Sequence, residues 1–579
     1  MKKILFLIIS GSLYSIVSAA PVKYIQSVST RQANTVINID TATIGNLTID
    51  KLYAPNLVIS PVNYNNCVGN GVVDCSTGIQ TAIAVATTSG GGIVYFPPGL
   101  YMIGKSVVVY SSVTLAGAAY GSVTWKATPG MNDRILQNQA RLGYGTDYNI
   151  TIRDIIFDES GRDTAVTFAR VNNLLMERCT LKNGSSGLFL LTGSTYDDNH
   201  HCYFVDCIFD SSNLVSGGTD INDWGNGYDI QIIRCKFIGG YTNSGNPQIS
   251  AAGMRQFIIK DSWFDGQSNA APISILGING GGIYNSEIFN SDGFGIKVSK
   301  FTEGTPDSDI FDFVIDGNKI HDNGDYGIWL RQETNPLDTP RNLIIKNNHI
   351  QRNGKNAFNI EVASGLIVSN NFISENSKLS TGTYYAVDLI QTGNDSTGLR
   401  NIFFDGNIFA DTQTIKSQTK IFQLSYVNGF RSKNNQFLNS VTTYTVNAGT
   451  TDNIKLLDGD NNYYVGSLSR DLTTASGNVT YTGTSFTPTA LEFFQINTSS
   501  NSMSWGFDDG SNAHSIIYIS SATSTMDSVS GYSIVVTDAS GSNRQRGYVS
   551  SFGLDQFTIT WEKTGSPTGS AVVKYKAQR

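Results

Sequence analysis

Glu361 and Asp388 are the carboxylates whose positions suggest chemistry, because each occupies an outward position of an alternating segment. The segments are AFNIEVAS (357–364) and YAVDLIQT (385–392). Aliphatic residues at every second position predict β-strands with one buried and one solvent-facing side. If the strands are neighbours about 4.8 Å apart, the proximity of two like charges raises the pKa of one of the carboxyl groups, as a general acid requires. Carboxyl groups about 5–5.5 Å apart suit the acid and nucleophile of a retaining glycosidase, so we predict that this pair is catalytic.

Other functional side chains share these outward positions. The predicted column reads Lys297, Trp329, Glu361, Asp388 and Gln423, and Ser299 and Arg331 begin the next column. An outward tryptophan offers a platform on which a sugar ring can stack. We therefore predict Trp329, Arg331 and Lys297 as substrate-binding residues, and we expect Asp220 and Trp224, in TDINDWGNG (219–227), to line the same surface further along.

A purely structural explanation competes with this interpretation. A solvated strand face carries polar residues in any case, and carboxylates that alternate with lysine and arginine also form simple cross-strand pairs. Substitution separates the two readings. Because both side chains are expected to face outward, Glu361→Gln and Asp388→Asn should each lower turnover by several orders of magnitude and leave the melting temperature nearly unchanged.

The strands that position these residues belong to a repeat, seen in FVIDGNKIHDNG (313–324), LIIKNNHIQRNG (343–354) and LIVSNNFISENS (366–377). One polar slot recurs at Cys179, Cys207, Cys235, Ser262, Ser286, Asn318, Asn348, Asn371, Asn407 and Asn435. An apolar slot follows it at Leu181, Phe209, Phe237, Phe264, Ile288, Ile320, Ile350, Ile373, Phe409 and Phe437. Spacings of 23 to 36 residues indicate a solenoid. Short strands without helices between them predict a parallel β-helix with equivalent slots stacked, so that asparagines pair along the stack.

Six cysteines are too few to build a fold of 579 residues by disulfides. Cys179, Cys207 and Cys235 fall in the polar slot, so we predict that they are stacked core residues with no redox or metal role. Cys67 and Cys75 flank a short Gly/Asn loop, and they can pair in an oxidising compartment.

The repeat resembles the single-stranded right-handed β-helix superfamily of pectate lyases, polygalacturonases and phage tailspikes. The segment CVGNGVVDCSTGIQTAIAVATTSGGGIVYFPPGLYMI (67–103) resembles the entry segment of that superfamily, although Cys67 and Cys75 stand where acidic residues are usual. The resemblance implies a right-handed β-helix over 63–465, with a capping helix that begins at Ser76 as N-cap. It says little about the reaction, because this scaffold hosts many chemistries. The polygalacturonase Asn-Thr-Asp and Gly-His-Gly signatures and the alginate-epimerase Asp-Pro-His-Asp signature do not occur.

The two ends of the chain differ from the repeat. Residues 1–20 pair a basic start with a short apolar run and a small-residue ending, which predicts a cleaved signal peptide. Residues 21–62 suit either a stalk that pairs chains or a plain leader strand. Residues 466–579 contain short strands separated by Gly/Ser turns, which predict a β-sandwich. This module resembles the small C-terminal modules of phage tail fibres, which implies attachment or trimerisation.

The predicted fold class is therefore all-β, with a single-stranded right-handed parallel β-helix and a small C-terminal β-sandwich. A net charge of −7 argues against a nucleic-acid partner. We expect no cofactor, no metal site, and no membrane span once the signal peptide is removed. The predicted protein is secreted, at a cell surface or on a virion, and it forms a homotrimer.

We predict that its partner is a capsular, exo- or cell-wall polysaccharide, which it binds and hydrolyses. One alternative is a lyase, in which Lys297 removes a proton beside a uronate carboxylate that Arg331 neutralises. The other is an adhesin that only holds glycans.

Overall fold

The computed structural model describes residues 4–9, 12–17, 57–131, 133–160, 166–184, 187–192, 199–210, 219–224, 227–239, 247–266, 272–300, 310–332, 339–391, 398–438, 442–446, 455–457, 463–484, 487–497, 502–519, 525–537 and 542–578. Residues 1–54 and 55–579 form two compact units. In the first unit, β1 (Ile4–Ile9) and β2 (Ser12–Val17) pair antiparallel.

The predicted signal peptide, residues 1–20, includes both of these strands, and it stays a prediction. The predicted leader segment lies outside the described residues as far as residue 56. Within the described ranges, no helix has the length and apolar character needed to cross a bilayer.

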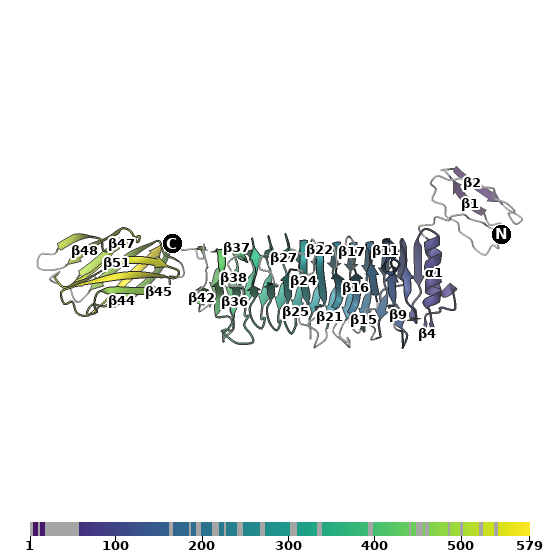
Figure 1. The fold of residues 1–579 in the computed structure, drawn as a ribbon, viewed down its shortest axis with the longest axis horizontal. Helices are drawn as coiled ribbons and strands as arrows, with labels where there is room; N and C mark the ends of the chain where they lie inside the picture. The colour runs from purple at the N-terminus through teal and green to yellow at the C-terminus, as the bar shows by residue number, and fades with distance from the viewer. Residues whose placement is uncertain are drawn as a thin grey trace. The chain divides into compact units, whose positions relative to one another are not determined.

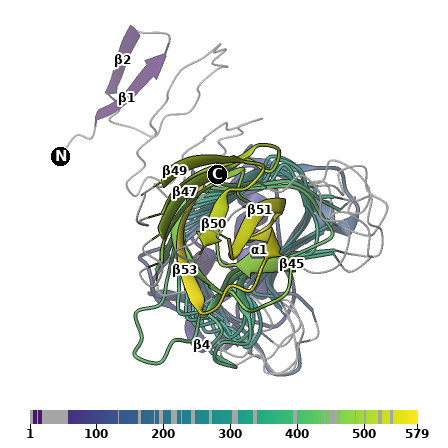
Figure 2. The same ribbon diagram turned by 90° about the vertical axis from the view of Figure 1, so that its left-hand side faces the viewer.

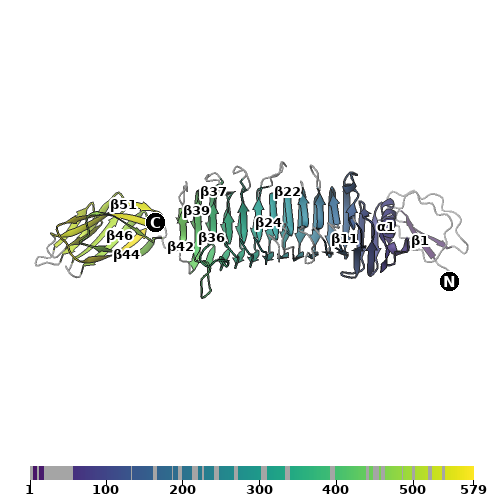
Figure 3. The ribbon, with the colours of Figure 1, turned by 60° about the horizontal axis from the view of Figure 1, so that its bottom comes forward.

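The repeat builds a parallel β-helix whose turns follow one another in chain order (Figures 1 and 3). Seen from the end in Figure 2, the turns overlie one another. Three stacks of parallel strands form its walls: stack A and stack B, which belong to one sheet of 27 strands, and a corner sheet of 14 strands. Inward Ile, Val, Leu and Phe side chains from all three walls form one continuous core. The predicted β-helix is confirmed.

Stack A comprises β3 (Val58–Ile59), β5 (Gly92–Phe96), β8 (Val113–Gly117), β11 (Asp147–Arg153), β14 (Val171–Glu177), β17 (His200–Val205), β20 (Tyr228–Ile233), β22 (Ile249–Lys260), β24 (Ile273–Tyr284), β27 (Val314–Asp316), β30 (Ile344–Lys346), β34 (Ile367–Ser369), β37 (Leu399–Asp405), β40 (Val427–Lys433) and β43 (Lys455–Leu457), with β33 (Ala363–Ser364) paired to β37.

Stack B comprises β7 (Val107–Val109), β10 (Leu136–Asn138), β13 (Val166–Ala169), β16 (Gly187–Thr192), β19 (Thr219–Trp224), the first halves of β22 and β24, β26 (Ile296–Ser299), β29 (Ile328–Arg331), β32 (Phe358–Ile360), β36 (Tyr385–Ile390), β39 (Lys420–Ser425) and β42 (Thr442–Val446).

The corner sheet comprises β4 (Asn70–Asp74), β6 (Gly99–Ile103), β9 (Val123–Ala127), β12 (Ile156–Asp158), β15 (Thr180–Lys182), β18 (Ile208–Asp210), β21 (Lys236–Ile238), β23 (Trp263–Asp265), β25 (Glu287–Phe289), β28 (Lys319–His321), β31 (His349–Gln351), β35 (Phe372–Ser374), β38 (Ile408–Ala410) and β41 (Gln436–Leu438).

The predicted polar slot forms a hydrogen-bonded ladder at the corner between stack A and the corner sheet. The backbone N–H and the side-chain Nδ2 of Asn318 both donate to Oδ1 of Asn348, at 2.9 and 3.0 Å. The same pair of bonds links Asn348 to Asn371, Asn371 to Asn407, and Asn407 to Asn435. Each asparagine is thus held by the next one along the stack, as predicted. Further toward the N-terminus, Cys179, Cys207 and Cys235 are buried free thiols in the same slot, also as predicted.

A second ladder was not predicted. Asn323, Asn353 and Asn376 follow the corner strands, and the Nδ2 groups of Asn323 and Asn353 each donate to the next asparagine at 2.9 Å. All three side chains are buried. The signal was present in the printed repeat, where HDNG, QRNG and SENS end the phrase with an asparagine in a fixed place.

Replacing Asn348 with leucine is expected to lower the free energy of unfolding by at least about 3 kcal/mol. The two donors of Asn318 lose their buried acceptor, the carbonyl oxygen of Ile315 loses the Nδ2 donor, and Oδ1 of Asn371 keeps only the backbone N–H of residue 348. Chemical denaturation of the variant checks this. Gln436→Leu, at an exposed strand position beside Asn435, is the matched control and should change stability little. A loss below 1 kcal/mol for Asn348→Leu would contradict the structural role of the ladder.

The helix α1 (Ser76–Thr88) buries Ile79, Ala82 and Ile83 against the first strands of the β-helix (Figures 1 and 3). Its N-cap is Cys75, so the prediction of Ser76 as N-cap was wrong by one residue. The Ser76 hydroxyl instead donates to Asp74 and accepts from the backbone of Gly104 at 2.9 Å, which ties the helix to β6. Cys67 and Cys75 form a disulfide that closes the loop before this helix.

The C-terminal module is a β-sandwich, as predicted. One sheet runs in the order β44 (Tyr463–Asp471), β53 (Ser570–Gln578), β46 (Ala490–Asn497), β47 (Ser502–Asp508), β48 (Ala513–Ile519) and β49 (Thr525–Ser530). The other runs in the order β45 (Gly477–Thr482), β52 (Gln556–Thr564), β51 (Arg544–Gly553) and β50 (Ile534–Thr537). All pairings are antiparallel, and Leu491, Phe493, Phe557, Trp561 and Tyr575 lie in the core between the sheets.

Candidate functional site

The outward column of stack B differs from the predicted column at one position. The strand register places Lys297 opposite Trp329, Trp329 opposite Asn359, Asn359 opposite Asp388, and Asp388 opposite Gln423. The position predicted for Glu361 is therefore occupied by Asn359, and that part of the prediction was wrong.

The prediction for Glu361 was wrong because it assigned the wrong residues of strand β32 to the inward side. The prediction paired Ile360 and Val362 with the preceding strand, whereas the structure pairs Phe358 with Ile328 and Ile360 with Leu330. Phe358 is fully buried, so this large apolar residue, and not Val362, completes the inward pair of β32. The shift of two residues moves Glu361 just beyond the end of the strand.

Glu361 nevertheless returns to the same surface through its side chain. Its Oε1 accepts hydrogen bonds from Nε1 of Trp329 at 2.9 Å and from Nδ2 of Asn359 at 3.3 Å. Its Oε2 accepts from the backbone N–H of Gln332 at 3.0 Å. Three donors from two neighbouring turns therefore fix the orientation of this carboxylate, while one of its roughly four lone-pair sites is left over.

The environment of Asp388 differs from that of Glu361, whose carboxylate is held by three hydrogen-bond donors. Burial, and secondly the negative charge of the nearby Glu361 carboxylate, together raise the pKa of Asp388 to about 7. Among the described residues, its buried Oδ1 has no hydrogen-bond partner. A carboxyl group in this environment holds its proton close to neutral pH, so the site pairs a protonatable acid with a fixed carboxylate.

Aromatic rings and cations cluster around Trp329, the residue that donates to Glu361. Phe294 and Tyr326 contact the Trp329 ring, with centroid distances of 5.0 and 5.7 Å. The Arg331 guanidinium lies 5.0 Å from the centroid of Trp329, and the Lys355 ammonium lies 5.3 Å from that of Tyr326. Trp329 is therefore half-buried and does not stand out as the exposed platform that was predicted. Its N–H orients Glu361, and its ring packs against Phe294 and Tyr326.

Burial raises the pKa of Tyr326, and the negative charges of Asp325, Glu361 and Asp388 oppose its ionisation as well, against the effect of Lys355. Lys355 forms an ion pair with Asp325 at 2.8 Å. Tyr326 thus keeps its phenolic proton at neutral pH and brings a neutral hydroxyl to the neighbourhood of both acids.

Sequence reasoning missed Phe294, Tyr326 and Asn359. Phe294 and Tyr326 occupy equivalent places in FGI (294–296) and YGI (326–328), so the repeated aromatic-glycine-isoleucine triplet was a usable signal. The intervening glycines are required by close packing. A Cβ at Gly295 would lie 2.8 Å from the backbone oxygen of Gly327, and one at Gly327 would lie 2.8 Å from that of Ala357.

The other predicted site residues lie elsewhere on stack B. Asp220 and Trp224 belong to β19, and the register from Trp224 through Ala252, Leu276 and Ser299 to Arg331 puts four strand spacings, about 19 Å, between Trp224 and Arg331. Their side chains lie outside the described residues. Lys297 lies one strand from Trp329. In the part of the chain that the structure describes, no three His, Cys, Asp or Glu side chains gather into a group that could hold a metal ion.

Comparisons with known proteins place the chain among β-helices. Residues 62–305 match a family model described as rhamnogalacturonase A/epimerase, pectate lyase-like, and residues 221–409 and 305–465 match one described as right-handed β-helix region. The chain is 32% identical over 106 residues to the mannuronan C5-epimerase AlgE4 of Azotobacter vinelandii, which is 17% of this chain and 19% of that protein. It is 21% identical over 305 residues to AlgE2 of the same organism, which is 51% of this chain and 25% of that one. The matches span at most about a quarter of these curated relatives.

Solved structures with similar folds include a double mutant of the tailspike protein of E. coli bacteriophage HK620, with a TM-score of 0.50 and 12% identity over 90% of this chain and 93% of that one. The A-module of the A. vinelandii mannuronan C5-epimerase AlgE6 gives a TM-score of 0.41 and 17% identity over 70% of this chain and 100% of that one. At such identities the likeness concerns the fold alone. The chain is a right-handed parallel β-helix of the pectate-lyase-like fold.

Proposed function

We propose that this chain binds a complex polysaccharide along stack B and hydrolyses it, with Asp388 as general acid and Glu361 as nucleophile. The observation that carries the proposal is the pairing of a half-buried carboxyl group, whose Oδ1 is buried and whose pKa is about 7, with a neighbouring carboxylate held by three donors. Most glycosidases use two carboxyl groups, one kept protonated and one kept ionised by their environments, to cleave the glycosidic bond.

In the proposed reaction, Asp388 gives its proton to the glycosidic oxygen as the bond from that oxygen to the anomeric carbon breaks. Glu361 forms a bond to the anomeric carbon, which leaves a covalent glycosyl intermediate. Asp388, now ionised, removes a proton from water, and the resulting attack on the anomeric carbon releases Glu361. Both carboxyl groups return to their starting states, so no cofactor is consumed.

A second candidate is proton chemistry at C5 of a uronate sugar, either elimination or epimerisation. Two observations favour it. Arg331 lies over Trp329 beside the acids, where a guanidinium could neutralise a uronate carboxylate. The curated relatives are named mannuronan C5-epimerases, although the Asp-Pro-His-Asp signature does not occur in this sequence.

One experiment separates these reactions. The purified chain is incubated with a panel of polysaccharides in D2O, and new reducing ends, the ultraviolet absorbance of unsaturated uronates and deuterium at C5 are measured. Reducing ends alone support hydrolysis. Reducing ends with the absorbance indicate a lyase, and deuterium without cleavage indicates an epimerase. Binding without any of these changes would overturn catalysis and leave a glycan-binding protein.

Trp329→Phe is expected to lower kcat by about 10- to 100-fold and to change KM less, because it keeps a ring but removes the N–H that holds Glu361. Trp329→Ala should raise KM as well, since the contacts with Phe294, Tyr326 and Arg331 are also lost. Steady-state kinetics on the cleaved polysaccharide checks both. An unchanged kcat in Trp329→Phe would show that this hydrogen bond does not serve the reaction.

A further inference from the structure

The outer face of the six-stranded sheet in the C-terminal module is unusually apolar. Strand β47 alternates, with Ser502, Ser504 and Asp508 buried and its large apolar residues outside. The face carries Val465, Phe494, Ile496, Met503, Trp505, Phe507, Ile516, Met526 and Val572. The register makes five of these positions neighbours, because Trp505 lies opposite both Phe494 and Ile516, and Met503 lies opposite Ile496. Two lysines border this group, Lys574 opposite Phe494 and Lys576 opposite Val465.

The other sheet of the same sandwich shows what a solvated outer face looks like. There the hydroxyls of Thr480 and Thr558 pair at 3.0 Å, and Thr560 donates to Asn478 at 2.8 Å. A β-sandwich that only has to be soluble can make both outer faces polar in this way. The contrast between the two faces therefore points to a partner for the apolar one.

The size of the apolar face suits a protein partner. Its nine large side chains are between 38% and 74% exposed. An aromatic side chain presents about 150–250 Å², so Phe494, Trp505 and Phe507, which are 41%, 59% and 40% exposed, leave on the order of 200–350 Å² of apolar area in solvent. The aliphatic and thioether side chains add to this area, so the face reaches the size of the largest patch on a typical monomer, about 300–600 Å².

The chemistry of the face favours a second copy of the same chain. Aliphatic and thioether side chains make up much of it, and these offer a sugar no hydrogen bonds. Along one edge, Glu492 lies opposite Lys576 on one side and Phe507 on the other, and His514 follows beyond Phe507. An edge that carries both signs of charge can meet its own rotated copy without like-charge repulsion.

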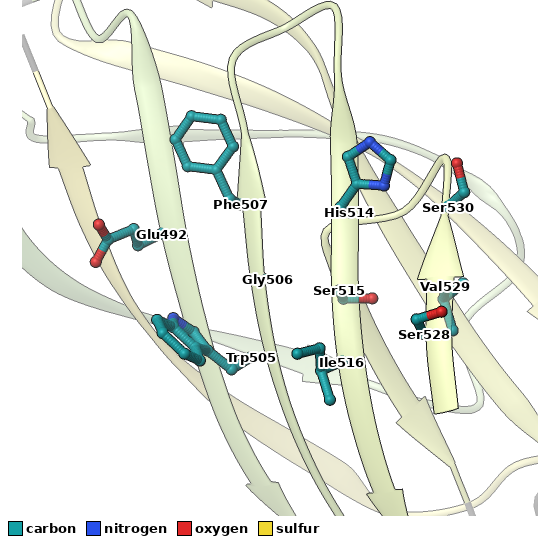
Figure 4. Close-up of a pocket in the computed structure, with 10 residues that line it drawn as sticks. All are labelled: Glu492, Trp505, Gly506, Phe507, His514, Ser515, Ile516, Ser528, Val529 and Ser530. Atoms are coloured by element: carbon teal, nitrogen blue, oxygen red, sulfur yellow. The ribbon is translucent and has the colours of Figure 1, made fainter. Parts of the chain in front are cut away.

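A hollow of about 460 Å³ lies on this face, and Figure 4 shows the residues that line it. Trp505 and Phe507 project from one strand, Glu492 lies to one side of them, and His514 and Ile516 lie to the other. A tryptophan that is 59% exposed beside a concave apolar surface is the arrangement found at the centre of protein interfaces.

We propose that the outer face of the sheet β44-β53-β46-β47-β48-β49 is the surface through which copies of this chain associate. The interface buries Trp505 and Ile516 near its centre, and the charged edge around Glu492 and Lys576 forms part of its rim. The proposal does not depend on the reaction at stack B.

The test measures the mass of the full chain by sedimentation velocity over a range of concentrations. The wild type should sediment as a multiple of the single-chain mass, and Ile516→Lys and Met526→Lys should each shift it to the single-chain mass. Thr480→Lys is the matched control, because it adds the same charge at an exposed strand position of the opposite sheet and should leave the mass unchanged. Circular dichroism of each variant shows whether the module is folded, and two separate variants protect the test against one that is not.

A wild type that is monomeric at all concentrations would overturn the proposal, as would oligomers that persist unchanged in both folded variants. Binding to a printed glycan array is measured in parallel with Trp505→Ala. Loss of glycan binding in that variant, with no change in mass for any variant, would identify the face as a glycan platform and would equally overturn the proposal.

Discussion

Asp388→Asn and Glu361→Gln are each expected to lower turnover of the cleaved polysaccharide by several orders of magnitude. Asparagine at 388 has no acidic proton for the leaving oxygen, and general acid catalysis alone contributes about 10²–10⁴-fold. Glutamine at 361 keeps the shape of the side chain but loses the negative charge that Trp329, Asn359 and the backbone of Gln332 hold in place. Initial rates of reducing-end release measure the effect.

Glu287→Gln is the matched control for this experiment. Glu287 is a half-exposed carboxylate on β25 of the corner sheet, a different wall of the β-helix, where it contacts His321 at 3.2 Å. The control should keep wild-type turnover. Near-normal turnover in both Asp388→Asn and Glu361→Gln would place the reaction elsewhere on the molecule, with the neighbourhood of Asp220 as the next candidate.

The pH profile carries the same argument further. A general acid must be protonated, so wild-type kcat/KM should fall as the pH rises through about 7, where Asp388 loses its proton. Glu361→Gln removes the charge that contributes to this raised pKa, so the alkaline fall of its residual activity should move to lower pH. If kcat/KM falls at the same pH in the wild type and in Glu361→Gln, the charge of Glu361 does not affect the pKa of the group that controls the reaction, which would contradict the assignment of Asp388 as the acid.

The solenoid could be predicted because its constraint is periodic. A residue such as Asn348 has an asparagine as its neighbour one turn before and one turn after. The same residue type therefore recurs in the sequence at each period. The predicted ladder was therefore correct without any knowledge of side-chain contacts. The second ladder through Asn353 follows the same logic and could have been found by aligning the ends of the repeated phrases.

The site could be predicted only in part, because its chemistry depends on register and burial that alternation does not define. Val362 and Phe358 both fit the inward pattern around Ile360, and the difference decides whether Glu361 or Asn359 faces Asp388. Packing of a large ring resolves this, and packing is a property of three turns together. The burial that raises the pKa of Asp388 likewise comes from neighbouring turns and leaves no trace in YAVDLIQT.

In one strand of the C-terminal module, the alternation of polar and apolar residues predicts the wrong buried side. In SMSWGFD (502–508) the simple rule that apolar residues point inward would bury Met503, Trp505 and Phe507. The structure buries the serines and Asp508, whose carboxylate accepts a hydrogen bond from the backbone of Val549 at 2.7 Å. Alternation thus identifies β47 as a strand, but it does not identify the side of β47 that is buried.

Asp388→Asn is also expected to stabilise the protein above neutral pH, in contrast to the unchanged melting temperature that an outward carboxylate would predict. The folded state holds the proton of Asp388 up to a pH of about 7, whereas an unfolded chain releases it near 3.8. Stability from this group is therefore fully present below pH 3.8, declines as the pH rises, and is lost above about 7. The difference between the two pKa values, 3.8 and about 7, corresponds to a loss of at most roughly 4 kcal/mol in the free energy of unfolding.

Asparagine is neutral at every pH, so it resembles the protonated form and avoids this loss. Thermal unfolding of the wild type and Asp388→Asn at pH 4 and pH 8 tests the expectation: the two Tm values should be close at pH 4, and the variant should melt higher at pH 8. Glu287→Gln is measured beside it, as the loss of a half-exposed carboxylate on another wall of the β-helix. Equal Tm values for wild type and Asp388→Asn at pH 8 would mean that the ionised carboxylate is at no disadvantage in the fold. The site would then lack the proton donor on which the proposed hydrolysis depends, whereas a higher Tm joined to lost turnover would show a residue kept at a cost in stability because its proton is used.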